Sequence, residues 1–438
     1  MTQRVKMKLA INGGEPVRTK KFPAYRVMGN EEKEAVCRVI DSGILSRFLG
    51  TWHDDFFGGP EVQAAEREWG EFLGVKHVVA VNSCTSALYC AAGATGVEPG
   101  EEMIVSPYTM SASATAPLVY NAIPVFADIE EAHYCLDPRS VEARITPRTR
   151  AIIVVDLFGQ PYDREAINAI AKKHGIFVIE DCAQAPGATW KGKCAGTLAD
   201  MGCFSLNYHK HVHTGEGGFV VTDDDDLAMK LRLIRNHAEA VVEKAGVTDL
   251  VNMIGFNYRM TEIEAALARC QLRRLPELLK QRQANCDYLN RALAEIPAIR
   301  PTSVRPGTTH SYYVHPLKFD EPVAGVGRDR FVEAVKAELP VPELHEGEGV
   351  KIGTGYCRPL YLQPLFQKRI AYGSKGAPFT SPWYDGNVSY EKGICPVTER
   401  MFEKELIRHE LMRPPMTHED LDDVVAAFWK VWENRHEL

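Results

Sequence analysis

The sequence predicts an α/β protein with helices on both faces of a mostly parallel sheet, followed by a smaller α+β domain at the C-terminal end. Short β-branched runs alternate with helical patterns between residues 77 and 222. The 438 residues exceed what one hydrophobic core usually spans, so two domains are expected. The composition, 45% hydrophobic and 25% charged, is that of an ordinary globular protein.

Two helical patterns precede the first predicted strand. The stretch EEKEAVCRVIDSG reads as a helix that ends near Gly43, and VQAAEREWGEFLG reads as a second helix. Between them lies a long loop that is rich in glycine and aromatic residues. Loops of this length are uncommon and are often functional.

The sheet is predicted to begin at HVVAV, residues 77–81, where the turn NSCTS leads into the helix ALYCAAGATG. YDREAINAIAKKHG is typical of an amphipathic helix. The other predicted strands are MIVSP, IPVFADI, AIIVVDLFG, IFVIED, MGCFSL and GGFVVTDD.

A long helix is predicted from Thr261, because TEIE has the form of a capping box with Glu264 as its third residue. Pro276 is expected to bend or restart this helix. We place the domain boundary near residue 285, giving an entry segment and large domain over 1–285 and a small domain over 286–438. The Pro- and Gly-rich loops at 340–395 are expected to cover a site.

Charge and patterning exclude several classes of function. The formal charge of -7 argues against nucleic acid as a partner, since phosphate binding favours a basic surface. No apolar run approaches the roughly 20 residues that span a membrane, and the basic N-terminus lacks the apolar core of a secretory signal. The 11 cysteines are scattered and never spaced as CxxC, which is typical of a reducing compartment. We expect a cytoplasmic protein that contacts neither nucleic acid nor membrane.

The stretch NYHKHVHTGEGG, residues 207–218, has two interpretations. His209, His211 and His213 would share one face, as metal ligands must, only if the segment were a strand. No further ligand stands at a recognisable spacing, so no metal is expected. In the second interpretation the reactive group is Lys210, which precedes a glycine-rich turn that a ligand can approach closely.

Two distant segments favour the lysine. IFVIED places Asp181 at the carboxyl end of a buried strand, the edge where ligands of open α/β sheets bind. NSCTSAL places small hydroxyl residues at a strand-to-helix turn, where free N–H groups and the helix dipole hold a phosphate. These three parts are what pyridoxal 5′-phosphate (PLP) needs. The lysine forms a Schiff base with it, the buried carboxylate pairs with its pyridinium nitrogen, and the turn binds its phosphate.

The sequence also resembles the DegT/DnrJ/EryC1/StrS sugar aminotransferases. EDCAQAPGATWKGKCAGTLADMGCFSLNYHKHVHTGEGGFVVTDD is similar to the core signature of this family, and the likeness covers most of residues 11–300 through NGGEPVRTKKFPAY, SGILSRFLG, NSCTSAL, VDLFGQP, LRLIRNH and GFNYRMTEIEAALA. It implies a type I PLP-dependent transferase fold (aspartate aminotransferase-like), PLP as cofactor, and a homodimer with active sites shared at the subunit interface.

Carried over by position, the resemblance assigns Lys210 to the Schiff base and Asp181 to the pyridine nitrogen. Gln184 would reach the ring hydroxyl, and Asn257 would reach the phosphate of the partner subunit's cofactor. The phosphate itself would be held by Ser205, Thr85 and the backbone of Cys84. One departure is Met110 in SPYTM, where many members carry an aromatic residue that stacks on the ring; a packed core methionine is the alternative.

The activity implied is transfer of an amino group from L-glutamate or L-glutamine to a keto-sugar or keto-cyclitol, with the cyclitol branch favoured by NGGEPVRT and the chain length. A PLP-dependent dehydratase, lyase or cyclising enzyme and a metal-dependent or non-catalytic member remain alternatives. Candidate substrate contacts are His209, His211, Arg47, His53 and Arg358, with Lys351 and His345 in neighbouring loops.

Overall fold

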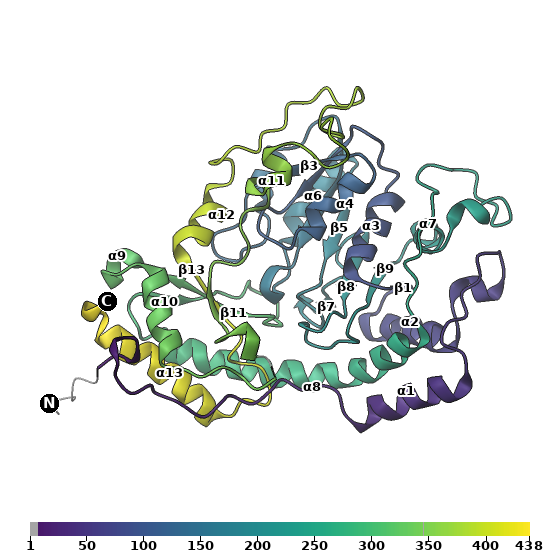
Figure 1. The fold of residues 1–438 in the computed structure, drawn as a ribbon. Helices are drawn as coiled ribbons and strands as arrows, with labels where there is room; N and C mark the ends of the chain where they lie inside the picture. Colours follow the sequence, from purple (N-terminus) through teal and green to yellow (C-terminus); the bar gives the residue numbers. More distant parts are fainter. Residues whose placement is uncertain (1–7, 345) are drawn as a thin grey trace.

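A computed structural model describes residues 8–344 and 346–438 of the chain (Figure 1). His345 lies outside the described residues. A large sheet with its helices occupies one part of the molecule and a smaller sheet the other, and one long helix runs beneath both (Figure 1). Within the described part, no helix combines the length and the apolar character that crossing a membrane would need.

The large sheet has seven strands in the order β1-β9-β8-β5-β4-β2-β3. Only β9 runs against its neighbours, since it pairs antiparallel with β1 and β8 while the other pairs are parallel. The prediction of a mostly parallel sheet is therefore confirmed. The strands are β1 (His77–Val81), β2 (Glu102–Val105), β3 (Ile123–Phe126), β4 (Thr149–Val155), β5 (Phe177–Asp181), β8 (Met201–Ser205) and β9 (Gly218–Thr222). A short hairpin, β6 (Thr189–Trp190) with β7 (Lys193–Cys194), lies outside it.

Helices bury both faces of this sheet. One face packs through Ile152 and Val105 against Leu88 and Leu231 of helices α3 and α7. The other packs through Phe204 against Trp69 of helix α2, together with part of the long helix α8. The helices of this part are α1 (Asn30–Ser42), α2 (Pro60–Leu73), α3 (Cys84–Ala94), α4 (Ala112–Val119), α5 (Pro138–Glu142), α6 (Arg164–His174) and α7 (Asp225–Arg235).

Helix α8 spans Glu262–Leu293 without interruption. The capping box is confirmed, because the Thr261 side chain accepts from Glu264 N while the Glu264 side chain accepts from Thr261 N. The expected restart at Pro276 is wrong: this residue lies inside one continuous helix (Figure 1). Tertiary packing along both sides of the helix outweighs the hydrogen bond that proline removes.

The smaller sheet is antiparallel, in the order β10-β11-β13-β12. Its core includes Cys286 and Leu293 from the end of α8, and also Leu9 and Phe22 from the start of the chain. In the other direction, Leu360 and Tyr390 pack into the core of the large sheet. The division at residue 285 thus stays a prediction, and two stretches of chain cross it. The elements are β10 (Ile299–Pro301), β11 (His315–Phe319), β12 (Ile352–Thr354), β13 (Leu406–His409), α9 (Glu321–Ala324), α10 (Arg328–Ala337), α11 (Pro364–Gln367), α12 (Pro396–Arg400) and α13 (His418–Glu433).

Candidate active site

Asp181 ends strand β5, at the carboxyl edge of the parallel strands, where its side chain is buried. Its Oδ2 accepts a hydrogen bond from Ser113 Oγ at 2.7 Å, and its Oδ1 accepts one from Ala183 N at 3.2 Å. Burial raises the pKa of the Asp181 carboxyl, while these bonds and the charge of Lys210 act in the opposite direction. A buried carboxylate held in this way is suited to pair with a cationic ligand atom.

A cradle of backbone N–H groups lies beside Asp181 at the start of helix α3. Ser83 caps the helix by accepting from Ser86 N at 3.0 Å, so the N–H groups of Cys84 and Thr85 have no partner inside the helix. Strand β9 begins against this turn: a Cβ added to Gly218 would lie 2.8 Å from Cys84 N and 2.6 Å from Phe204 O. The helix terminus and the neighbouring strand therefore meet closely only because this residue is glycine.

Ser205 ends strand β8 and pairs there with Gly218, the glycine that packs against the cradle. Its hydroxyl accepts from Asn207 N at 3.2 Å and begins the turn that carries Lys210. The Lys210 N–H donates to the Asn207 carbonyl at 2.9 Å, and the Lys210 Nζ lies 4.4 Å from the centroid of the Tyr313 ring. The lysine is thus held over an aromatic face contributed by the segment that leads into β11, close enough to Asp181 to act on its charge.

Gln184 is buried, and both ends of its amide form hydrogen bonds. Its Oε1 accepts from Phe158 N at 2.8 Å, and its Nε2 donates to the Tyr356 hydroxyl at 2.9 Å. Tyr356 in turn donates its backbone N–H to the Tyr108 hydroxyl at 2.8 Å. These bonds tie the turn after β5 to the loops after β4 and β2 and to residues of the C-terminal part.

The three alternate histidines point to different places, because the segment is a turn rather than a strand. His209 lines a cleft, whereas His211 is 1% exposed and bonds through Nε2 to the Ser311 carbonyl at 2.9 Å. His213 Nδ1 accepts from Gly215 N. Burial lowers the pKa of all three imidazoles. A substrate has no exposed face of His211 to contact in this arrangement.

Met110 is 64% exposed, so its interpretation as a core methionine is wrong. It follows Thr109, whose carbonyl accepts from the Cys357 thiol at 2.9 Å. Arg358 is therefore placed near the same loop, and its side chain is exposed. Asn257 is also exposed; its Oδ1 accepts from Arg259 and its carbonyl accepts from Asn82 at 3.4 Å, beside the start of α3.

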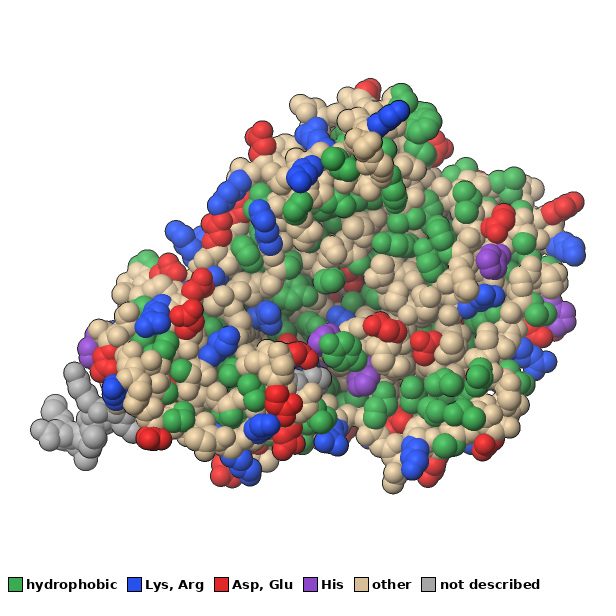
Figure 2. Space-filling view, viewed as in Figure 1, with side chains coloured by type: hydrophobic (Ala, Val, Ile, Leu, Met, Phe, Trp, Pro, Cys, Tyr) green, Lys and Arg blue, Asp and Glu red, His purple; other side chains and the backbone are tan. Residues whose placement is uncertain are grey.

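A cleft of about 320 Å³ is lined by His209, the residue before Lys210, and otherwise by residues of the C-terminal part. Figure 2 shows a hollow in the middle of the molecule, with acidic, basic and histidine side chains around it. Tyr313, on which the lysine rests, and Tyr356, which bonds to Gln184, both line it. Its other lining residues are His209, Val314, Lys336, Glu348, Val350, Lys351, Ile352, Arg408 and Glu410.

Arg47 and His53 do not line this cleft. Both lie on the loop between α1 and α2, where Arg47 Nε pairs with Asp55 Oδ1 at 3.0 Å and His53 Nδ1 accepts from Asp55 N at 3.1 Å. Lys351 does line the cleft, but it pairs with Glu348 and lies 3.9 Å from Glu410.

Sequence reasoning missed Ser113, Tyr313 and Tyr356. Each lies far along the chain from Lys210 and Asp181, in a segment whose sequence is that of an ordinary helix, strand or loop. Only SASATA, directly after SPYTM, offered a signal, because a serine there follows a strand end at the same edge of the sheet.

These residues fit PLP. The carboxylate of Asp181 suits a cationic ring nitrogen, Lys210 suits a Schiff base, and the cradle that depends on Gly218 suits a phosphate. Fold and site together define a PLP-dependent aminotransferase of the type I class.

Comparison with known proteins agrees. Residues 50–389 match the DegT/DnrJ/EryC1/StrS aminotransferase family, and the chain belongs to this family. It is 36% identical over 437 residues (97% of this chain and 98% of the relative) to a putative L-glutamine:3-amino-2,3-dideoxy-scyllo-inosose aminotransferase of Streptoalloteichus tenebrarius. It is 34% identical over 408 residues (92% and 94%) to the spore coat polysaccharide biosynthesis protein SpsC of Bacillus subtilis strain 168.

Among solved structures, an aminotransferase from Psychrobacter cryohalolentis superimposes with a TM-score of 0.79 at 29% identity, covering 95% of this chain and all of that one. The predicted family, fold and cofactor are confirmed. The family and its named cyclitol relative support transamination and lend no support to a lyase or a metal-dependent protein.

Proposed function

We propose that this aminotransferase moves an amino group from L-glutamine or L-glutamate to a keto-cyclitol or a keto-sugar. The observation that carries the proposal is the meeting of Lys210, Asp181 and the α3 cradle at one sheet edge, beside a polar cleft. The choice of donor and acceptor is supported by the name of the Streptoalloteichus relative, which matches nearly the whole chain.

PLP, when bound, supplies an electron sink for the charge left as a Cα–H bond of the donor breaks. Lys210 Nζ would serve as the general base that takes this α-proton and later returns a proton. The amine lies over the ring of Tyr313, which lines the cleft. Asp181, which accepts a hydrogen bond from Ser113 Oγ, would stabilise positive charge on the ring nitrogen of PLP.

We assign the remaining contacts as follows. Ser205, Thr85 and the N–H of Cys84 bind the phosphate, and Gln184 contacts the ring substituent that projects toward Tyr356. Met110, exposed beside this edge, covers the ring face.

The cleft takes the substrates. His209 contacts hydroxyl groups of the acceptor, because burial lowers the pKa of its imidazole and keeps the ring neutral and able both to donate and to accept. We assign Arg358, which is exposed and adjacent to Cys357, to an anionic group of the donor, although it is not one of the residues that line the cleft.

We further propose a homodimer in which Asn257, Arg47 and His53 serve the partner subunit's site. Each is exposed in the single chain, and exposed apolar side chains stand close to them in the sequence: Leu45, Leu49, Leu250 and Ile254. Such a group is typical of a surface that another subunit covers. The eleven unpaired cysteines support a reducing, cytoplasmic setting.

The test is a pair of half-reactions. Purified protein with PLP is incubated with L-glutamine or L-glutamate, and the oxo acid released is quantified; keto-cyclitols and nucleotide-linked keto-sugars are then supplied and the aminated product is identified. The proposal expects one equivalent of oxo acid per site without acceptor and continued turnover with it. Release with no keto acceptor consumed, or a dehydrated product, would exclude it.

A further inference from the structure

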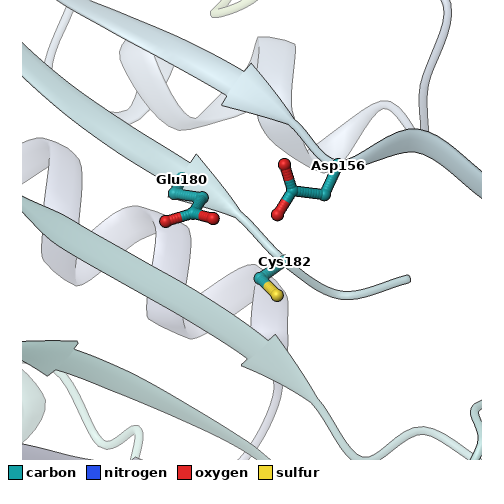
Figure 3. A group of neighbouring side chains, drawn as sticks. All are labelled: Asp156, Glu180 and Cys182. Carbon is teal, nitrogen blue, oxygen red and sulfur yellow. The ribbon is translucent and has the colours of Figure 1, made fainter. Parts of the chain in front are cut away.

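Two further acidic side chains and a cysteine lie at the ends of β4 and β5, close to Asp181. Asp156 follows β4, Glu180 is the residue before Asp181, and Cys182 is the residue after it; their ligand atoms all lie within 4.8 Å of one another and all three are buried (Figure 3). The mechanism proposed above makes no use of them. Two carboxyl groups facing each other without water need an explanation.

The hydrogen bonds distinguish the two acids. Both oxygens of Glu180 accept backbone N–H groups, from Gly196 at 2.7 Å and from Leu198 at 2.9 Å. Asp156 Oδ1 accepts from Tyr162 N at 2.9 Å, but its Oδ2 is buried without a hydrogen-bond partner. In Figure 3 the two carboxyl groups point toward each other, with Cys182 to one side. Glu180 is thus bonded as a carboxylate, whereas the Oδ2 atom of Asp156 accepts no hydrogen bond and can carry a proton.

We propose that Asp156 is a neutral carboxylic acid at physiological pH, that its Oδ2–H donates to Glu180, and that this pair positions two of the cofactor-binding residues. The proposal involves no covalent step. One proton between the two carboxyl groups gives each of them a hydrogen bond. A single negative charge then remains in the pair instead of two.

The charges around the pair agree with this placement of the proton. Burial raises the pKa of Asp156 well above its usual range, and the neighbouring Glu180 charge raises it further. Burial also raises the pKa of Glu180, but its two backbone bonds and Arg164 lower it, so the proton rests on Asp156. The other titratable groups that face the pair are Asp181, Cys182, Tyr162, Cys135, Cys194 and Cys203.

The pair reaches the cofactor site through the backbone. Asp156 N donates to the Asp181 carbonyl at 3.1 Å, which fixes the end of β5. Its Oδ1 holds Tyr162 N and so closes the loop 157–161, in which Phe158 has a positive φ of 61° and donates its N–H to Gln184. Asp156 is therefore a positioning residue for Asp181 and Gln184, and it contacts no substrate.

The direct test uses apo-protein and infrared difference spectroscopy in the carbonyl-stretch region of protonated carboxylic acids. Wild-type protein near neutral pH should absorb there, and Asp156→Asn should remove that band. The matched control, Asp128→Asn, changes a buried aspartate whose two oxygens already accept from Val397 N, Thr398 N and Thr398 Oγ1, so the band should persist. A wild-type protein without the band would overturn the proposal.

A second arm separates positioning from packing. Asp156→Ala removes both the donor to Glu180 and the acceptor for Tyr162, so PLP affinity should fall about tenfold, whereas Asp156→Asn should restore most of it because an amide offers both groups. Glu180→Gln should lower PLP affinity more than Asp156→Asn does, since an amide nitrogen would then face the N–H of Gly196 or Leu198. The reverse order of the two amide variants would contradict the assignment of the proton.

The pH dependence supplies a third readout. Because the folded pKa of Asp156 is raised, the unfavourable contribution of this acid begins as pH rises past its unfolded value of about 4 and grows until the folded value is reached. The melting temperature of wild-type protein should therefore decline with rising pH relative to Asp156→Asn. Metal analysis completes the test: one equivalent of a divalent ion, lost on Cys182→Ser, would show a metal in place of the proton and refute the proposal.

Discussion

Substituting alanine for Gly218 tests the phosphate cradle most sharply. The built Cβ would lie 2.6 Å from Phe204 O and 2.8 Å from both Cys84 N and Ser83 C, all of them backbone atoms. Each contact must lengthen by about 0.7 Å or more to reach ordinary van der Waals separation. Neither β8 nor the start of α3 can move alone, because both belong to the packed core.

Overpacking of this kind costs about 1–3 kcal/mol. If the start of α3 takes part of the shift, the N–H groups of Cys84 and Thr85 leave the positions in which we propose that they bind phosphate. We therefore expect Gly218→Ala to lower the melting temperature and to weaken PLP binding on the order of tenfold, which corresponds to about 1.4 kcal/mol.

The assay is titration of apo-protein with PLP, followed by absorbance, together with thermal unfolding. Gly347→Ala is the matched control, since its added Cβ would meet nothing within 4 Å and its φ carries no strain. A Gly218→Ala protein that is folded and binds PLP with wild-type affinity would refute the placement of the cradle.

Other substitutions have equally definite expectations. Asp181→Asn should keep the fold and lower kcat on the order of 100-fold or more, measured with the amino donor, because an amide cannot offset positive charge; near-wild-type turnover would argue against its role. Thr261→Ala removes the cap of α8, including its bond to Glu264 N, and should cost about 1 kcal/mol, seen as a lower melting temperature with unchanged PLP affinity. Burial and the neighbouring His315 lower the pKa of His310 to about 3. Its neutral form therefore contributes stability that is complete above the unfolded value of about 6.5 and is lost as pH falls toward 3, by about 3–5 kcal/mol at most. His310→Asn should flatten this acid dependence in thermal melts, whereas changing the exposed His174 should not.

Much of the fold could be predicted from the sequence because its signals are local. The β-branched runs that became β4 and β5 are buried on both faces, so they read as continuous apolar stretches. Gly43 and the Thr261–Glu264 box marked helix ends by chemistry that acts within four residues.

Long-range packing could not be predicted in the same way. The continuity of α8 through Pro276 depends on contacts with two cores, and the burial of His211 depends on the distant Ser311 carbonyl. Lys210 and Asp181 could be proposed from the sequence because Asp181 stands at the end of a buried strand and Lys210 precedes a glycine-rich turn. Tyr313 and the Asp156–Glu180 pair became visible only once separate strands lay side by side.

The measurement that tests the central claim most directly is the absorbance spectrum of the PLP-loaded protein before and after L-glutamine or L-glutamate, with Lys210→Ala beside it. Borohydride reduction and peptide mapping of the wild-type protein locate the attached cofactor. We expect a visible band that moves to the ultraviolet with donor, a label on the peptide that contains Lys210, and neither in the variant. A label on another lysine, or a donor response that survives Lys210→Ala, would contradict the account.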